Sequence, residues 1–215
     1  MSPTPPATAN TAFVSITRVF ISFEGLDGSG KTTQAALLAD AARAAGRDVI
    51  AVREPGGTAA GERIRALLLD PEARIAPWAE ALLYAAARTE LVAEVIRPAL
   101  DRGATVIADR YVDSSIAYQG VARGLGVDEV LDVSLAATGR LLPDRTILLE
   151  LPWDVAAGRL DGTADRMEAE ADAFHGSVAD GFAEVARRFP ERVVVVDGSG
   201  PPEDVANRVR AAVGL

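Results

Sequence analysis

Short runs of consecutive apolar residues alternate along the chain with longer segments in which apolar residues recur every three or four positions. The runs occupy residues 19–23, 49–52, 105–108, 146–151 and 193–196. Because the apolar residues of these runs are mostly consecutive, rather than at every second position, they predict strands that are buried on both faces of a sheet.

The segments between the runs have the periodicity of helices with one apolar face. They occupy residues 32–45, 58–69, 78–101, 128–140, 169–189 and 202–213. Pro98 falls inside the third segment and is expected to kink that helix or to end it early. Strands that alternate with helices imply right-handed crossovers. The pattern therefore predicts a three-layer α/β/α fold, a parallel five-stranded sheet with helices on both faces.

Residues 1–17 are rich in Pro, Thr and Ala and carry no charge, so we expect a flexible N-terminal extension. They lack the basic region and the continuous apolar stretch of a signal peptide. No run of about 18 apolar residues, the length that spans a membrane, occurs in the sequence. We therefore expect a cytoplasmic protein, with residues 18–215 forming one domain.

Composition excludes several kinds of chemistry. The 31 acidic residues outnumber the 22 basic ones, and a net charge of −9 argues against nucleic-acid binding as the main role. The chain has no cysteine, which rules out disulfides and thiolate nucleophiles. Its one histidine, His175, has no partner pattern and is expected to be structural.

The first apolar run leads into Gly25–Thr32, which reads GLDGSGKT and matches the phosphate-binding loop pattern G-x-x-x-x-G-K-S/T. Its glycines let backbone N–H groups turn toward an anion, and the following helix N-terminus adds further donors. Lys31 is suited to the β- and γ-phosphates, and the Thr32 hydroxyl is suited to Mg²⁺. The predicted ATP site comprises Gly25, Leu26, Asp27, Gly28, Ser29, Gly30, Lys31, Thr32 and Thr33.

The distribution of basic residues supports this interpretation. The chain contains 21 arginines and one lysine, and the lysine occupies the single position where the loop needs a compact, flexible ammonium group. Asp109 ends the third apolar run, next to the loop in the expected sheet. Together with Thr32 it is the predicted ligand pair for Mg²⁺, although aspartates at strand ends also cap turns.

A phosphate-binding loop alone fits an ATPase, a GTPase or a kinase. Guanine recognition usually involves an Asn-Lys-x-Asp motif, and this chain has no second lysine. The chain is also short and acidic for a motor or a helicase core. Of these classes, a kinase that acts on a small molecule is the remaining possibility.

Three further motifs accompany the loop: REPGG at residues 53–57, LYAAAR at 83–88 and DRYVDSSIAYQG at 109–120. With FEGLDGSGKTT at 23–33, this set resembles the thymidylate kinase family, in consistent order from about Val19 to the C-terminus. The resemblance implies a P-loop kinase fold and phosphoryl transfer from ATP to dTMP with Mg²⁺. It also implies a homodimer, although the apolar third helix would read the same if it were packed inside one subunit.

The resemblance assigns roles around the acceptor nucleotide. It implies that Tyr84 stacks on thymine and that Arg88, four residues later, bonds a base carbonyl. Read without the family, Tyr84 fits a core position and Arg88 a solvated partner of an acidic neighbour. Arg53 and Arg110 are the expected clamps on the acceptor phosphate. Asp27 matches a contact to the 3′-hydroxyl or to the water shell of Mg²⁺. The remaining expected dTMP contacts are Arg65, Ser114, Ser115, Tyr118, Gln119 and Glu168.

Residues 157–168 resemble the lid that closes over ATP in this family, and DRME at 165–168 matches its D-R-x-E pattern. Gly158 and Gly162 suggest mobility, and Arg159 and Arg166 are the only cations of the segment. Some family members carry an arginine inside the loop where this chain has Gly28. The lid arginines must then supply that charge, and the sequence leaves open which one contacts the transferring phosphoryl group.

The acceptor implied by the resemblance is already anionic, so the reaction needs alignment and charge neutralisation rather than a strong general base. The expected catalytic residues are Lys31, Arg53, Arg110, Arg159 and Arg166. Adenine is expected near residues 197–198. Two alternatives stay open: a related kinase that accepts dUMP, CMP or a deoxynucleoside, and an ATP-binding switch with little turnover.

Overall fold

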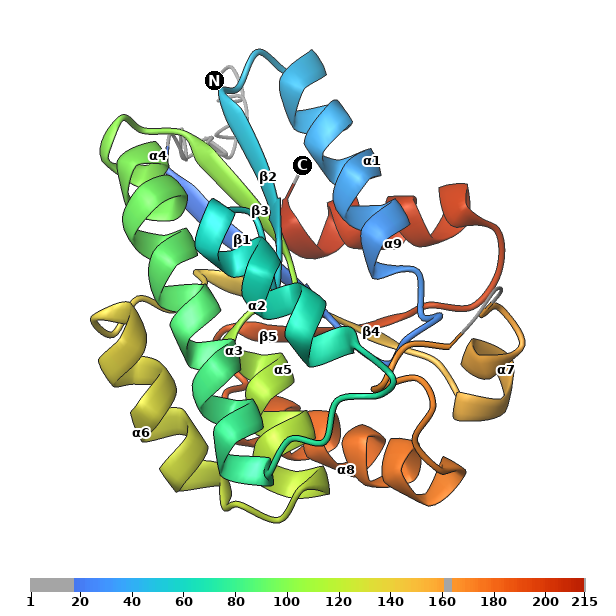
Figure 1. The fold of residues 1–215 in the computed structure, drawn as a ribbon. Coiled ribbons are helices and arrows are strands. Elements are labelled where there is room, and N and C mark those ends of the chain that lie inside the picture. Colours follow the sequence, from blue (N-terminus) through green and yellow to red (C-terminus); the bar gives the residue numbers. More distant parts are fainter. Residues whose placement is uncertain (1–17, 161–163, 215) are drawn as a thin grey trace, which may run out of the picture.

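A single parallel sheet forms the centre of the molecule (Figure 1). The computed structural model describes residues 18–160 and 164–214, so the predictions for residues 1–17 and for Gly162 lie outside the described residues. The strands follow the order β2-β3-β1-β4-β5, and every neighbouring pair is parallel. Their bounds are β1 Val19–Glu24, β2 Val49–Arg53, β3 Thr105–Asp109, β4 Arg145–Glu150 and β5 Val193–Asp197.

Two helices cover one face of the sheet. They are α1 (Lys31–Ala44) and α9 (Pro202–Val213), which pack against each other and against the strands. Leu38 of α1 and Val209 of α9 join alternate residues of β1, such as Ile21 and Phe23, in one apolar cluster. Alternation along the strand sends the intervening residues to the opposite face.

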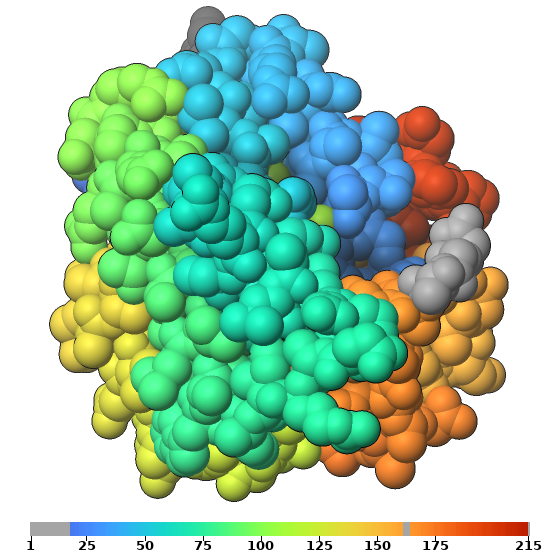
Figure 2. Space-filling view, viewed as in Figure 1, coloured from blue at the N-terminus to red at the C-terminus, as the bar shows by residue number. Residues whose placement is uncertain are grey.

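The second face carries the larger core and more of the helices (Figure 1). A long helical path runs through α3 (Pro77–Leu91), η1 (Val92–Ile96) and α4 (Arg97–Asp101). Beside it lie α5 (Val112–Ser115), η2 (Ile116–Ala122) and α8 (Asp172–Arg188). The outer helices are α2 (Ala59–Leu69) and α6 (Val127–Thr138), and α7 (Trp153–Ala157) follows β4. Seen from the same side, α2 and α3 cover the front of the space-filling surface in teal and green (Figure 2).

The sequence predictions of strands and long helices are confirmed, with bounds that differ by a few residues. Pro98 does not end the third helix early. The path continues to Asp101 because residues 92–96 widen into a π-helical turn, in which the Arg97 N–H reaches the Val92 carbonyl oxygen. This wider turn accommodates Pro98, because proline has no backbone N–H and its ring crowds the preceding turn.

Apolar periodicity did not reveal the helical residues 112–122, which were recognised only as a motif, or the short helix α7. In the first case seven consecutive residues, 116–122, form a π-helix, whose period differs from the 3.6 residues used to find helices. Gly181 of α8 allows this segment to pack closely, since a Cβ at that position would lie 2.7 Å from the Ala117 Cα. Within the described residues, no helix is both long and apolar enough to cross a membrane.

Candidate active site

A cavity of about 880 Å³ lies at the C-terminal ends of β1, β2 and β3. In an open parallel sheet this edge is where ligands bind. Most of the predicted site residues line it: Asp27, Gly28, Ser29, Gly30, Lys31, Thr32, Thr33, Arg53, Arg65, Tyr84, Asp109, Arg110, Ser114, Ser115, Tyr118, Gln119, Arg159 and Glu168. Four predicted residues are not part of its wall, namely Gly25, Leu26, Arg88 and Arg166.

The phosphate-binding loop joins β1 to α1, and Gly30 immediately precedes the first helical residue. Gly28 has a φ of +78°, and a Cβ there would lie 2.1 Å from the carbonyl oxygen of Ala156 in α7. The loop therefore packs against the start of the lid segment with no room for a side chain. An arginine, which some family members carry at this position, would not fit here unless α7 moved.

Leu26 does not face the phosphate site as predicted. Its side chain lies in the core beneath the loop, and only its carbonyl oxygen takes part, accepting a hydrogen bond of 2.7 Å from Lys31 Nζ. Gly25 likewise contributes its carbonyl oxygen, which accepts from Arg110. Both residues shape the loop from behind.

Lys31 is almost fully buried, with 6% of its surface exposed. Burial and the nearby Arg110 together lower its pKa to about 8, against the opposing effect of Asp27 and Asp109. Its ammonium group lies 3.8 Å from Asp27 Oδ1. An anion bound in the loop would replace water as the partner of this poorly solvated charge.

The two predicted metal ligands meet across the strands. Thr32 Oγ1 donates to Asp109 Oδ2 at 2.5 Å, one residue from α1 and the other from β3. Hydroxyl and carboxylate oxygens are the hard ligands that Mg²⁺ prefers, and it usually completes its shell with water and phosphate oxygens. No cluster of three acidic or histidine side chains suited to a metal occurs in residues 18–160 and 164–214. The pair therefore fits a magnesium ion held mainly by a bound nucleotide.

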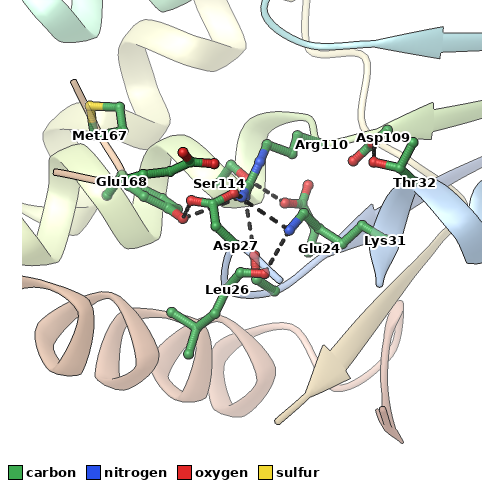
Figure 3. A network of polar contacts seen from close by, with 12 residues as sticks. Glu24, Leu26, Asp27, Lys31, Thr32, Asp109, Arg110, Ser114, Met167 and Glu168 are labelled. Carbon is green, nitrogen blue, oxygen red and sulfur yellow. Dashed lines mark hydrogen bonds and ion pairs between the residues drawn. The ribbon is translucent and has the colours of Figure 1, made fainter. Parts of the chain in front are cut away.

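Arg110 has the left-handed backbone conformation, with φ of +72°, at the turn after β3. This conformation is costly for a residue other than glycine, and such strain concentrates at functional sites. Its guanidinium donates to Ser114 Oγ at 2.9 Å and to Asp27 Oδ1 at 2.5 Å, and these side chains point toward one another in Figure 3. Although burial alone would raise the pKa of Asp27, Arg110 and Lys31 hold it well below its usual range.

Glu24, the last residue of β1, was missed as a functional residue. It is fully buried and accepts a hydrogen bond of 2.8 Å from the Tyr111 N–H. It also accepts one of 2.6 Å from Ser114 Oγ, and both Glu24 and Ser114 are labelled in Figure 3. Burial and the neighbouring Asp113 raise its pKa to about 8. It thus holds the residues that flank the strained turn at Arg110. A charged residue at the end of an otherwise apolar run was the available signal.

Arg53 and Arg65 both contact the same backbone group on the acceptor side of the cavity. Arg53 Nη1 and Arg65 Nη1 donate to the Pro55 carbonyl oxygen at 3.2 and 3.0 Å. Arg53 is about half exposed and also pairs with Glu62 at 3.0 Å. Two neighbouring guanidinium groups in the cavity wall suit the recognition of an anionic group.

Arg88 lies behind the cavity wall rather than in it. Its side chain is 1% exposed and forms an ion pair of 2.7 Å with Glu54, while Nη2 donates to Ser115 Oγ at 3.0 Å. Tyr84, one turn earlier on α3, does line the cavity. The structure therefore gives Arg88 an acidic partner, but in a buried setting. Glu54 faces the cavity and was overlooked, although the REPGG motif contains it.

The two lid arginines point in different directions. Arg159 lines the cavity, with its guanidinium 3.5 Å from the Gly198 carbonyl oxygen. Arg166 instead pairs with Glu80 at 2.7 Å and donates to the Leu68 carbonyl oxygen at 2.6 Å. Of the two arginines in the described part of the lid, only Arg159 lines the cavity.

The cavity extends from Arg159 to Gly198, Gly200, Pro202 and Val205, next to the predicted adenine position. The apolar residues at this end were not predicted from the sequence, because they come from the start of α9 rather than from a motif. His175 is fully buried and stacks on Trp153 at 3.8 Å between ring centres, outside the cavity wall, in agreement with a structural role.

A phosphate-binding loop on the central strand, facing a strained arginine on the neighbouring strand, defines a P-loop kinase fold. A family model for thymidylate kinase matches residues 23–209 of the chain. The chain therefore belongs to the thymidylate kinase family.

Individual relatives agree with this assignment. A thymidylate kinase of Clavibacter sepedonicus is 49% identical over 199 residues, covering 91% of this chain and 94% of its own length. One from Leifsonia xyli subsp. xyli is 50% identical over 195 residues, covering 89% and 92%. The crystal structure of a thymidylate kinase from Ehrlichia chaffeensis has a TM-score of 0.74 at 32% identity, covering 91% of this chain and 98% of that one.

Proposed function

We propose that the cavity binds ATP and dTMP end to end, with the donor phosphates on the P-loop and the acceptor base beside Tyr84 and Gln119. As a member of the thymidylate kinase family, the chain is an enzyme that transfers a phosphoryl group from ATP to dTMP, giving ADP and dTDP. The observation that carries this arrangement is that one continuous cavity is lined by Lys31 and Thr32, by Arg110, and by Tyr84 and Gln119.

At the donor end, backbone N–H groups of the P-loop and the Lys31 ammonium group bind the phosphates. Thr32 and Asp109 would hold Mg²⁺, and the ion would supply neutralisation of the phosphate charge. Arg159 provides the lid charge over the transferring group, since Arg166 is engaged by Glu80. Adenine lies against Gly198 and Val205.

At the acceptor end, Arg53, Arg65 and Arg110 neutralise and orient the monophosphate. The attacking oxygen of a monophosphate is already anionic, so no strong general base is required. Catalysis consists of alignment and charge stabilisation, which explains how a site without histidine can work. Asp27 positions Arg110 and contacts the 3′-hydroxyl or the water shell of the metal, and Glu168 lines the same cavity.

At the base, Tyr84 supplies a flat apolar surface, and Ser114, Ser115, Tyr118 and Gln119 complete the pocket. Arg88 acts from behind the wall by holding Ser115 and Glu54. Direct contact between Arg88 and a base carbonyl stays a prediction that requires the pocket wall to open toward it.

The proposal includes a cytoplasmic homodimer. Leu67 of α2 and Trp78 and Leu82 of α3 are 47%, 42% and 53% exposed. Large apolar side chains on adjacent helices are suited to a contact with a second copy of the chain. Sedimentation at micromolar concentration tests this, and a monomer with no concentration dependence would remove it from the proposal.

An acceptor panel tests the proposed function. ADP release is measured with ATP and magnesium against dTMP, dUMP, dCMP, CMP and thymidine. Release that depends on dTMP, with the highest kcat/KM of the panel, is expected. A preference for another acceptor would indicate a different kinase, and tight ATP binding without acceptor-dependent release would indicate an ATP-binding switch.

A further inference from the structure

Glu80 is a buried carboxylate that the proposed reaction does not use directly. It lies in the first turn of α3, and only 1% of its surface is exposed. Four hydrogen bonds and ion pairs reach it from other elements. Gln119 Nε2 donates to Oε1 at 2.9 Å, Arg123 spans both oxygens at 3.2 and 3.3 Å, and Arg166 Nη1 lies 2.7 Å from Oε2.

These contacts fix the carboxylate in place and keep it charged. Arg123 is itself held by Glu170 at 2.6 Å, and Arg166 by the Leu68 carbonyl oxygen. Although burial alone would raise the pKa of Glu80, the hydrogen bonds from Gln119, Arg123 and Arg166 lower it below its ordinary value. An ionised carboxylate accepts hydrogen bonds and cannot donate any.

This property determines the orientation of the Gln119 amide. Because Glu80 can only accept, the NH₂ of Gln119 must face Glu80, and its carbonyl Oε1 must face away. Gln119 lines the acceptor end of the cavity. Its Oε1 makes no hydrogen bond to any part of the chain that the structure describes, yet it is not enclosed as an unpartnered buried atom. The open cavity is therefore the space available to Oε1.

We propose that Glu80 is a positioning residue that makes Gln119 present a hydrogen-bond acceptor to the base, and so selects pyrimidines with an N–H at ring position 3. Thymine and uracil carry that N–H, whereas cytosine has an unprotonated nitrogen there. An acceptor that faces an acceptor leaves two buried groups unpaired, and sites built on one polar match reject such analogues strongly. This inference rests on the proposed placement of the dTMP base beside Gln119.

The principal test replaces Glu80 with a side chain that can both donate and accept. In Glu80→Gln the Gln119 amide is free to turn over, so discrimination weakens. The ratio of kcat/KM for dTMP to that for dCMP is expected to fall about 10- to 100-fold, through the KM of the nucleotide. The KM of ATP should stay the same. An unchanged ratio would overturn the proposal.

Two further variants separate positioning from a general structural effect. Glu80→Asp keeps an acceptor-only group and should restore most of the discrimination. Glu170→Gln removes a carboxylate from the same cluster without touching Gln119, and should leave the ratio unchanged. Equal losses of discrimination in Glu80→Gln and Glu170→Gln would assign the effect to cluster charge and contradict the proposal.

A measurement on the unaltered protein covers the case in which Glu80→Gln does not fold. In the dTMP complex, NMR should show a hydrogen-bonded thymine imino proton and slowly exchanging Gln119 Nε2 protons close to Glu80. Contacts between those Nε2 protons and thymine would overturn the inference. Failure of the acceptor panel with the unaltered enzyme would instead refute the proposed function, so the two failures are distinguishable.

Discussion

Arg110 and Asp27 join the two ends of the site through a hydrogen bond of 2.5 Å between Nη2 and Oδ1. Asp27 belongs to the P-loop, which we propose binds the donor phosphates, whereas Arg110 follows β3 and is the proposed clamp on the acceptor phosphate. The pair is mostly buried, with 16% of the Arg110 side chain and 23% of the Asp27 side chain exposed. The position of the proposed acceptor clamp is therefore tied directly to the proposed donor loop.

Arg110→Lys tests the clamp. Lysine keeps the charge but lacks the planar fork that contacts Asp27, Ser114 and the Gly25 carbonyl oxygen together. We expect kcat/KM for dTMP to fall about 10²- to 10³-fold, with a much smaller change in the KM of ATP. Arg102→Lys, at an exposed arginine that pairs with Asp48, is the control and should behave like the unaltered enzyme. Similar losses of kcat/KM for dTMP and for ATP would contradict the assignment of Arg110 to the acceptor phosphate.

Lys31 predicts a dependence on pH. Burial lowers its pKa to about 8, so in the free enzyme the ammonium group loses its proton as the pH rises through that value. The charge needed for phosphate binding is present below pH 8, and kcat/KM for ATP should decline above it. Bound phosphates favour the ammonium form, so kcat should decline only at higher pH. A flat kcat/KM profile from pH 7 to 9.5 would refute this role.

Arg159 and Arg166 should differ in what their loss affects. Arg159 faces the cavity, so Arg159→Ala should lower kcat about 10- to 100-fold, at the lower end of what one charge-stabilising donor contributes. Arg166 pairs with the buried Glu80, so Arg166→Ala should mainly lower the unfolding temperature and raise the KM of dTMP. Steady-state kinetics and thermal unfolding of both variants check this. A larger loss of kcat in Arg166→Ala would reverse the assignment.

Gly28 and Gly30 form a matched pair in the P-loop, with φ of +78° and +95°. A Cβ at Gly28 would lie 2.1 Å from the Ala156 carbonyl oxygen, whereas a Cβ at Gly30 would meet nothing within 4 Å. Gly30→Ala should cost only the backbone strain, about 1–2 kcal/mol of unfolding free energy. Gly28→Ala should cost clearly more, because α7 must move. Urea unfolding of both variants measures the difference, and equal costs would show that the clash is relieved freely.

Glu54 and Arg88 form a buried ion pair, with 4% and 1% of the side chains exposed. Glu54→Gln leaves the Arg88 charge buried without its counterion, which typically costs about 3–5 kcal/mol of unfolding free energy. The control is Asp40→Asn, which removes the exposed partner of Arg43 and should cost less than about 1 kcal/mol. Urea unfolding at pH 7.5 checks both values. If Glu54→Gln lowered the unfolding free energy as little as Asp40→Asn does, the buried pair would not contribute to stability.

Much of the fold was predictable because its signals are local. Continuously apolar runs identified all of the described strands, and the P-loop was recognisable from eight consecutive residues, GLDGSGKT. The helical segment at 112–122 was harder, since its π-helical turns do not repeat every 3.6 residues. Glu24 and Glu54 lie within recognised motifs, but the sequence offered no means of telling that their carboxylates are buried.

The sequence alone determined the strands and most of the helices, the phosphate-binding loop motif and the family to which the chain belongs. Hydrophobic periodicity and loop chemistry act over a few neighbouring residues, so they can be read along the chain. Only the tertiary structure decided which arginines face the cavity. Long guanidinium side chains turn toward whichever carboxylate the fold places within reach. Glu54 engages Arg88 and Glu80 engages Arg166, whereas Arg110 and Arg159 remain in the cavity wall.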